Sequence, residues 1–366
     1  MKKEMTSMQL IVITCFIGIL LTAAIFYLTN TFITGDAALT SYCYDGNVIE
    51  GNDPINTFNR AIYQNEASLS FIHEGQYTLF GAVNSNLVIA GHDNFLFEVS
   101  DDRFQYNYLE DYKGNCHFTE EESARILENL QNRYSYYKAH GDDYLLVILP
   151  NAQTVYSEKM PSYYGNISED TRLNRLQGYL TEHGFINFIN LTDDLQSAKG
   201  DEILYHNTQN SLNALGMYYA YREVYNVLNP EQFYGTTPVE RASLRFYQHN
   251  TAGKALAEKV GLEEIIENRT LSLSEGPTQS YVVDSTDTST LLTPPCEDTS
   301  TYPVLLLQFS NNQDRLLSEP YFSNTFYKVT YQTGLRGTVP ASHRGNPRIV
   351  VQFIYENELG HLLEQE

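Results

Sequence analysis

Short apolar runs alternate with amphipathic segments along most of this chain. Residues 88–97 (VIAGHDNFLF) predict two short strands around a turn at Gly91 to Asn94. Residues 144–149 (YLLVIL) are continuously apolar, which is typical of a strand that is buried on both faces of a parallel sheet. Shorter apolar runs predict further strands at 185–189, 304–307 and 349–354.

Three segments with a helical stripe lie between these strands. The first opens with a capping-box pattern, Thr119 with Glu122, and ends at Gly141. The second covers about residues 170–182 and carries leucines on one face, and the third covers 212–228. Because strands alternate with helices, the pattern predicts an α/β fold in which a parallel sheet is flanked by helices.

The N-terminal region has a different pattern. No charged residue occurs from Met5 to Gly35, and residues 10–28 are long enough to cross the hydrocarbon core of a bilayer as one helix. Lys2 and Lys3 precede this stretch, so the N-terminus is expected in the cytoplasm. A cleaved signal peptide is the alternative, but the length of the stretch favours a retained transmembrane anchor. In either case the rest of the chain is exported.

This pattern divides the chain into two parts. Residues 1–35 are predicted to form the cytoplasmic tip and the transmembrane anchor, and residues 36–366 an extracytoplasmic domain. The segment 274–302 is rich in Ser, Thr, Asp and Pro, and we expect it to be an insertion in that domain, either a surface excursion or a small β element between its two halves. The expected location is therefore the cell membrane, crossed once, with the bulk of the chain outside.

Composition narrows the classes of ligand. Lys and Arg total 23 against 45 Asp and Glu, which gives a formal net charge of −22. Nucleic acid and anionic lipid need clustered cations, so neither is expected as the main partner. The chain has 29 Tyr and no Trp, a composition that suits neutral polar ligands such as sugars. The tyrosine groups at 134–137, 163–164 and 218–219 could stack on sugar rings, although their helical spacing favours packing.

Cysteine and histidine spacing predicts neither a metal nor a cofactor. Of the four cysteines, Cys43, Cys116 and Cys296 lie outside the predicted anchor, so at most one disulfide can form within the chain. No Cys-x-x-Cys pair occurs, and no Cys/His cluster has zinc-ligand spacing.

Several stretches in order resemble one family. Residues 91–97 (GHDNFLF) resemble its glycine turn and apolar triplet, residues 148–156 with Pro161 its Pro-Asn strand end, and residues 171–176 its Arg-Leu helix. Residues 347–355 (PRIVVQFIY) resemble its final strand. This order is similar to that of the alginate O-acetylation proteins of the AlgX/AlgJ type and their Gram-positive relatives with a DHHW motif. The resemblance spans about residues 55–360 and implies an SGNH-hydrolase-like fold.

The family's central motif is Asp-x-His-Trp-Asn-x-x-Gly, and this chain departs from it. Residues 209–216 read QNSLNALG, so Asn213 and Gly216 are kept. Gln209 stands at the place of the acid and Ser211 at the place of the general base, and the tryptophan has become a leucine. The family's nucleophile lies in a later Gly-Asp-Ser-Phe turn. The resemblance implies that Ser310 occupies its position, after a glutamine and a phenylalanine.

These replacements affect the chemistry directly. A serine hydroxyl is a poor nucleophile unless a nearby base takes its proton, and neither Ser211 nor Gln209 titrates near pH 7. Removing members of such a triad lowers turnover by about 10⁴- to 10⁶-fold. His206, in the same loop, and His343, before the last strand, are the histidines that could substitute. We expect both to be exposed, solvated residues.

Two functional hypotheses follow, and a third stays open. The first is a membrane-anchored, catalytically degenerate member of the O-acetylation group that binds a cell-surface polysaccharide or a membrane-bound O-acyltransferase. The second is an active acetyltransferase or acetylesterase that uses Ser310 with an unrecognised base. Loss of the acid and the base favours the first. The third is a structural envelope protein, because fold does not fix function.

Overall fold

The computed structural model describes residues 42–44, 47–49, 66–83, 85–101, 106–228, 237–276, 281–282, 288–292, 304–326, 328–334 and 348–364. The chain divides into two compact units, residues 1–80 with 260–262 and residues 81–259 with 263–366. The first unit contains the antiparallel pair β1 (Tyr42–Tyr44) and β2 (Asn47–Ile49) and the helix α3 (Glu66–Phe80).

The predicted transmembrane span, residues 10–28, lies outside the described residues. None of the described helices has the length and apolar content needed to cross a bilayer. The expected boundary at residue 35 stays a prediction.

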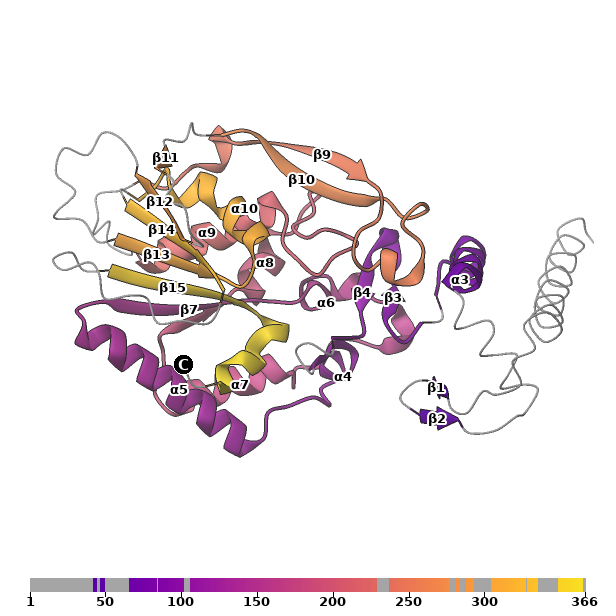
Figure 1. Cartoon of the computed structure of the whole chain (residues 1–366), viewed down its shortest axis with the longest axis horizontal. Helices are drawn as coiled ribbons and strands as arrows, with labels where there is room; N and C mark the ends of the chain where they lie inside the picture. Colours follow the sequence, from indigo (N-terminus) through magenta and orange to yellow (C-terminus); the bar gives the residue numbers. More distant parts are fainter. Residues whose placement is uncertain are drawn as a thin grey trace, which may run out of the picture. The chain divides into compact units, whose positions relative to one another are not determined.

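The second unit is built on a seven-stranded sheet with the order β11–β12–β14–β13–β15–β7–β8 (Figure 1). The strands β14, β13, β15, β7 and β8 are parallel to one another, whereas β12 pairs antiparallel to β14. Their bounds are β7 (Asp143–Leu149), β8 (Phe188–Asn190), β11 (Tyr281–Val282), β12 (Thr288–Leu292), β13 (Val304–Phe309), β14 (Lys328–Thr333) and β15 (Arg348–Tyr355). The parallel sheet that the sequence predicts is confirmed.

Helices cover both faces of this sheet, as Figure 1 shows. On one face α9 (Ala214–Leu228) and α10 (Asn312–Phe322) pack against odd-numbered strand residues such as Val351 and Phe353. On the other face α5 (Glu120–Ala139) and α7 (Arg172–Glu182) pack against even-numbered residues such as Val350 and Ile354. Because successive strand side chains point to opposite faces, each continuous apolar run packs against the helices on both faces of the sheet.

The helix starts and ends predicted from the sequence are present in the structure. Thr119 accepts a hydrogen bond from the backbone N–H of Glu122, and the Glu122 carboxylate accepts one from the N–H of Thr119, so the capping box opens α5. Gly141 follows that helix with a φ of 78°, a conformation that glycine adopts without strain. The helices predicted at 170–182 and 212–228 are present as α7 and α9.

One predicted strand is displaced. The sequence predicts a strand at 185–189, but β8 covers Phe188–Asn190. The backbone N–H of Phe185 donates to the carbonyl of Leu180 at 2.9 Å, so this residue closes the C-terminus of α7 and does not enter the sheet. Its ring is buried, which explains why hydrophobicity alone suggests a strand.

The second unit also contains three antiparallel pairs outside the main sheet. These are β3 (Val88–Ala90) with β4 (Leu96–Glu98), β5 (Ser100–Asp101) with β6 (Tyr106–Asn107), and β9 (Arg245–Thr251) with β10 (Asn268–Glu275). The first confirms the hairpin predicted at 88–97. Short helices α4 (Tyr108–Tyr112), α6 (Ala152–Val155) and α8 (Thr192–Ala198) connect the larger elements.

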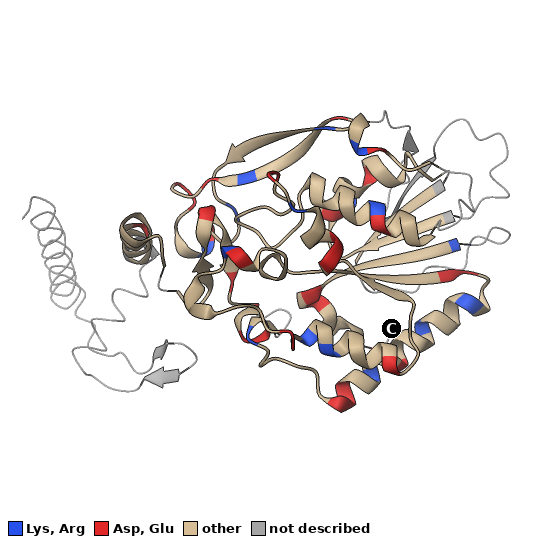
Figure 2. Cartoon of the chain, turned by 180° about the vertical axis from the view of Figure 1, so that it is seen from behind, with Lys and Arg blue, Asp and Glu red and all other residues tan. Residues whose placement is uncertain are grey.

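The segment 274–302, expected to be an insertion, is described only in part. Its described strands β11 and β12 extend the main sheet on the β14 side. The bounds of the expected insertion stay a prediction. Figure 2 shows acidic and basic positions interspersed over the helices of the second unit.

Candidate active site

Polar residues gather where three neighbouring parallel strands end. Asn151 follows β7 by two residues, Ser310 directly follows β13, and Glu356 directly follows β15. Since these strands are parallel and adjacent, their carboxyl ends meet at one edge of the sheet. In open α/β sheets, ligands bind outside this edge.

Ser310, the predicted nucleophile, is half-buried at this edge. Its Oγ accepts a hydrogen bond from Asn311 Nδ2 at 3.4 Å. Asn311 also caps α10, because its Oδ1 accepts from the backbone N–H of Asp314 at 2.9 Å. Among the residues that the structure describes, no imidazole forms a hydrogen bond to the Ser310 hydroxyl.

The two residues before Ser310 belong to the sheet. Gln308 is buried and its Nε2 donates to Gln332 Oε1 across the parallel pair β13–β14 at 3.1 Å. The Phe309 ring stacks on Phe353, with ring centroids 4.6 Å apart and an interplanar angle of 8°. These two side chains, which the resemblance predicts at the places of the family's glycine and aspartate, therefore serve packing and strand pairing.

The segment 204–213 is a hairpin. Tyr205 forms an antiparallel bridge with Leu212, the N–H of His206 donates to the carbonyl of Ser211, and the N–H of Asn213 donates to the carbonyl of Leu204. Residues that face each other in such a pair place their side chains on the same side. His206 and Ser211 therefore share one side of the hairpin.

Hydrogen bonds hold this hairpin on two sides. Toward the strand ends, Asn210 Nδ2 donates to Asn151 Oδ1 at 3.1 Å, and the Tyr205 hydroxyl donates to the carbonyl of Pro150 at 2.5 Å. Toward β10, the Thr208 hydroxyl donates to Asn268 Oδ1 at 2.9 Å. The backbone around Gln209 and Ser211 is consequently fixed.

Gln209 and Ser211, the predicted replacements of the acid and the base, lie at the tip and on one arm of this hairpin. Gln209 is half-buried. The Ser211 hydroxyl is buried and has no hydrogen-bond partner among the described residues. An unpaired buried hydroxyl costs about 1–3 kcal/mol, so this position is not optimised for stability.

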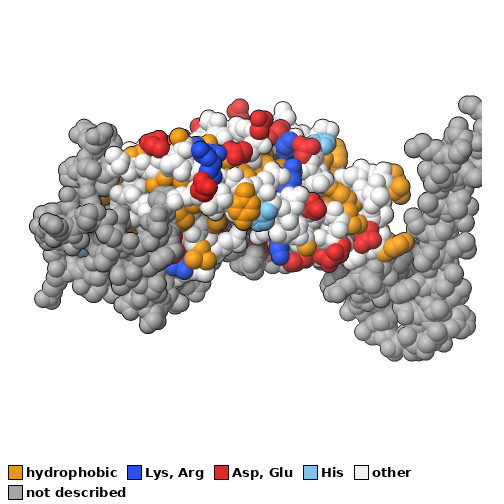
Figure 3. Space-filling model, turned by 90° about the horizontal axis from the view of Figure 1, so that it is seen from above, with side chains coloured by type: hydrophobic (Ala, Val, Ile, Leu, Met, Phe, Trp, Pro, Cys, Tyr) orange, Lys and Arg blue, Asp and Glu red, His pale blue; other side chains and the backbone are white. Residues whose placement is uncertain are grey.

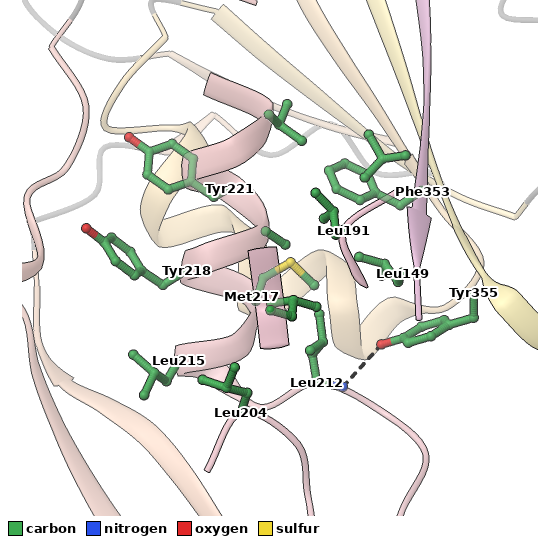
Figure 4. Close-up of a cluster of buried hydrophobic side chains, with 14 of the residues drawn as sticks. Leu149, Leu191, Leu204, Leu212, Leu215, Met217, Tyr218, Tyr221, Phe353 and Tyr355 are labelled. Atoms are coloured by element: carbon green, nitrogen blue, oxygen red, sulfur yellow. Dashed lines mark hydrogen bonds between the residues drawn. The ribbon is translucent and has the colours of Figure 1, made fainter. Parts of the chain in front are cut away.

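Leu212, the predicted replacement of the family's tryptophan, belongs to the core. Its side chain is fully buried beside Leu204, Leu215 and Met217, and Figure 4 shows this cluster. The N–H of Leu212 donates to the Tyr355 hydroxyl at 3.2 Å, drawn as a dashed line in Figure 4. This bond ties the hairpin to the end of β15.

Asn213 and Gly216, which the resemblance predicts to be retained motif residues, have structural roles. Asn213 is fully buried, and its Oδ1 accepts from the N–H groups of Leu215 and Gly216 at 3.0 and 3.1 Å, which caps α9. A Cβ on Gly216 would lie 2.2 Å from the carbonyl oxygen of Leu204. The close approach of α9 to the hairpin therefore requires glycine.

The expectation that His206 is exposed is wrong. His206 is 8% exposed, because the hairpin turns its side chain inward, and its Nε2 lies 3.3 Å from Nε2 of Gln313. An amide NH₂ can only donate, so the imidazole nitrogen accepts there. Nδ1 is buried with no hydrogen-bond partner among the described residues. His343 lies outside the described residues.

The electrostatics of this edge keep His206 neutral. Burial and, to a smaller extent, the nearby His249 lower the pKa of His206 to about 4. The same burial raises the pKa of carboxyl groups. Burial raises the pKa of Asp314 to about 6, although hydrogen bonds from Asn311 and Tyr355 oppose the shift.

Glu356 belongs to a further buried network. Burial first, and then the charge of Asp111, raise its pKa to about 7. Its Oε2 accepts from the N–H of Asn151 and from the Thr154 hydroxyl, both at 2.8 Å. Sequence reasoning missed Asp314 and Glu356. The available signal for Glu356 was its position directly after a predicted parallel strand, where functional polar residues often lie.

The tyrosine groups serve mainly as packing residues. Tyr137 and Tyr218 are buried, and the Tyr137 ring stacks on Tyr144. Tyr163 differs, because it is 72% exposed. Figure 3 shows one face of the molecule on which acidic, basic and apolar side chains are interspersed, without a continuous basic patch in the described part.

Comparisons with solved structures support the fold. The O-acetyltransferase domain of Pseudomonas putida AlgJ aligns with a TM-score of 0.50 and 14% identity over 75% of this chain and 92% of that one. Bacillus cereus PatB1, solved with a sulfonyl adduct, aligns with a TM-score of 0.52 and 11% identity over 76% and 98%. A DHHW family protein from Eubacterium siraeum gives 0.52 and 11% over 77% and 96%. At these identities the likeness concerns the fold.

Sequence comparison identifies the family itself. No curated protein sequence matches the chain. The family model described as the SGNH hydrolase-like domain of the acetyltransferase AlgX matches residues 88–314, more than half of the chain. That range includes the hairpin 204–213 and Ser310. The chain therefore belongs to the AlgX family of SGNH hydrolase-like domains.

Proposed function

We propose that this chain is a membrane-anchored, catalytically inactive member of the AlgX family that binds a cell-surface polysaccharide or a protein of its O-acetylation machinery. The observation that carries the proposal is the environment of Ser310. The Ser310 hydroxyl accepts a hydrogen bond from Asn311. The hairpin that would supply a base carries Ser211 instead, and the buried Ser211 hydroxyl has no hydrogen-bond partner among the described residues.

His206, which contacts Gln313 three residues after Ser310, is a poor substitute for the missing base. The accepting Nε2 of His206 already contacts Gln313, and no carboxylate holds Nδ1 among the described residues. In a serine triad, that carboxylate fixes the tautomer and stabilises the imidazolium. A pKa of about 4 also places His206 well below the range that suits a general base at pH 7.

A binding role agrees with the parts of the motif that remain. Asn213 and Gly216 maintain the hairpin and the start of α9, so this part of the scaffold is kept although Gln209 and Ser211 supply no titrating group. The aligned part of AlgJ is an O-acetyltransferase domain, and the matching family model describes an acetyltransferase. From these two similarities we infer that this chain is associated with polysaccharide acetylation, but not that it catalyses the reaction.

The membrane location is part of the proposal. Residues 10–28 are apolar and uncharged, and Lys2 and Lys3 precede them. Expression of the full chain should leave it in the membrane fraction after alkaline carbonate extraction. Protease added outside intact cells should digest the region beyond residue 35. Release of the chain by carbonate, or protection from external protease, would contradict this part.

The catalytic part is tested with the full-length protein and an acetyl ester. We expect hydrolysis at the uncatalysed rate, equal for the wild type and Ser310→Ala, and no mass increase with phenylmethanesulfonyl fluoride. The variant Gln209→Asp with Ser211→His restores the acid and the base on a fixed hairpin, so it should gain measurable esterase activity. A sulfonyl adduct on wild-type Ser310 would refute the proposal.

The second candidate is an active esterase or acetyltransferase in which His206 serves Ser310. It is favoured by the burial of His206 and by its contact with Gln313, which lies three residues after Ser310. In that case turnover by the wild type should fall to background in both Ser310→Ala and His206→Gln. Turnover that neither substitution changes would exclude this candidate.

A further inference from the structure

A cleft lies between α7 and α8, beyond the end of β8. Its volume is 790 Å³, within the range of small-ligand sites. The described residues that line it are Thr154, Ile167, Ser168, Glu169, Thr171, Leu173, Asn174, Gln177, Gly178, Thr181, Glu182, Asn190, Thr192, Asp193 and Gln196. None of the residues proposed for ester chemistry belongs to this set.

The lining is polar but not cationic. It contains four side-chain amides and five hydroxyls, and the described lining residues include no Lys, Arg or His. Glu169, Glu182 and Asp193 are its charged groups. An anionic sugar chain would be repelled by these carboxylates, and the described lining residues offer no cation to compensate. The charge of the cleft therefore disfavours binding of anionic sugars.

Hydrogen bonds within the lining orient its amides. Asn190 Nδ2 donates to Gln177 Oε1 at 2.8 Å, which leaves the Gln177 NH₂ group without a partner among the described residues. Gln196 Nε2 donates to the carbonyl of Thr154 at 2.9 Å, and Asn174 Nδ2 to that of Glu169 at 3.0 Å. The cleft therefore offers one oriented amide donor and two amide oxygens, Gln196 Oε1 and Asn174 Oδ1, as acceptors.

We propose that this cleft is a binding site for an uncharged saccharide. Sugar hydroxyls both donate and accept hydrogen bonds, so they match a lining that presents amide donors and acceptors in fixed positions. The half-buried apolar side chain of Ile167 can contact the C–H groups of a sugar ring. The inference rests on the proposed function, in that it locates the polysaccharide which the chain binds and gives its charge class.

The cleft is linked to the strand-end network. Thr154 lines the cleft, and its hydroxyl donates to Glu356 at 2.8 Å. Gln196 reaches the carbonyl of the same threonine. A glycan held in the cleft would therefore lie along the edge of the sheet at which Asn151 and Glu356 are placed. The affinity for the glycan would then come from the cleft and would not depend on Ser310.

The test uses the full-length protein in lipid nanodiscs and isothermal titration calorimetry. The uncharged probes are hexasaccharides of β-linked glucose, α-linked glucose, mannose and N-acetylglucosamine. A mannuronate hexamer is the anionic probe and a glucosamine hexamer the cationic one. We expect saturable binding of at least one uncharged probe and none of the mannuronate.

The decisive variant is Gln177→Glu. It keeps an oxygen that can accept from Asn190 but removes the NH₂ donor and adds a negative charge to the cleft. Loss of one hydrogen bond to a ligand should weaken binding by about tenfold. Gln131→Glu makes the same change at an exposed position on α5 and should leave the dissociation constant unchanged. Far-UV circular dichroism checks that both variants are folded.

The outcomes are distinct. Binding of an uncharged probe that weakens in Gln177→Glu and not in Gln131→Glu supports the inference. Equal affinity in both variants places the glycan elsewhere and overturns the inference, while the proposed binding function stands. Preference for the glucosamine hexamer, abolished in Asp193→Asn, would identify a cation site and also overturn it. Absence of binding to every uncharged probe overturns the inference, while the alternative that the chain binds a protein of the acetylation machinery stands. Ester turnover refutes only the proposed lack of catalysis.

Discussion

Replacing Gly216 by alanine separates two opposing effects that can be calculated from the structure. In the interior of a helix, Gly→Ala normally stabilises by about 0.5–1 kcal/mol, since alanine loses less backbone entropy. At position 216 the added Cβ would lie 2.2 Å from the carbonyl oxygen of Leu204 and 2.7 Å from Cδ2 of Leu212. A backbone oxygen cannot rotate away, so α9 or the hairpin must shift.

Overpacking of this kind costs about 1–3 kcal/mol, and a contact with backbone lies toward the upper end of that range. After subtraction of the alanine gain, we expect Gly216→Ala to lower the free energy of unfolding by about 2 kcal/mol. Gly178 in α7 is the matched control, because a Cβ there meets nothing within 4 Å. Gly178→Ala should stabilise by about 0.5–1 kcal/mol.

Urea unfolding followed by far-UV circular dichroism measures both effects, and tyrosine fluorescence gives a second probe because the chain has no Trp. The midpoint should move to lower urea for Gly216→Ala and to higher urea for Gly178→Ala. If the two variants shift the midpoint in the same direction, the close approach of α9 to the hairpin is wrong, and Gly216 is retained for another reason.

Three further predictions concern the core of the second unit. Asp142→Ala should lower the free energy of unfolding by about 3–5 kcal/mol, because it removes the buried carboxylate that accepts hydrogen bonds from the Arg348 guanidinium; urea unfolding checks this. Leu212→Trp, which restores the family's residue, should cost about 1–3 kcal/mol in a core already filled, and an unchanged melting temperature would contradict this. Since the pKa of Glu356 is raised to about 7 from 4.5, the folded state retains that proton to higher pH than the unfolded state, so stability should fall as pH rises between these values. Glu356→Gln should reduce that fall, as measured by melting temperature against pH; an identical pH profile would show that Glu356 does not cause it.

The central part of the fold could be predicted because its signals are local. The capping box at Thr119 and the apolar run 144–149 each identify an element without knowledge of the rest. Phe185 marks the limit of this approach. It is apolar and buried like a strand residue, but a hydrogen bond to Leu180 assigns it to the end of a helix. The hydrophobicity of a residue predicts that its side chain is buried, but it does not predict which backbone group the residue pairs with.

The elements that carry the predicted site residues could be predicted from the sequence, whereas the surroundings of these residues could not. The family resemblance identifies Ser310 and the hairpin that carries Ser211, and the family match supports that resemblance. The sequence places His206 in solvent, yet it is buried, because its exposure depends on Gln313, more than a hundred residues later in the chain. The raised pKa of Glu356 likewise depends on Asp111, which no local pattern connects to it.

The order of strands has a consequence for how the protein is made. The last strand of the sheet in sequence, β15, lies between β13 and β7 and pairs with both. Until residues 348–355 have left the ribosome, β7 and β13 have no common neighbour, and the Tyr355 hydroxyl cannot anchor Leu212. The apolar edges of two incomplete half-sheets would stay open during synthesis, so a chain truncated before residue 348 should aggregate or be degraded.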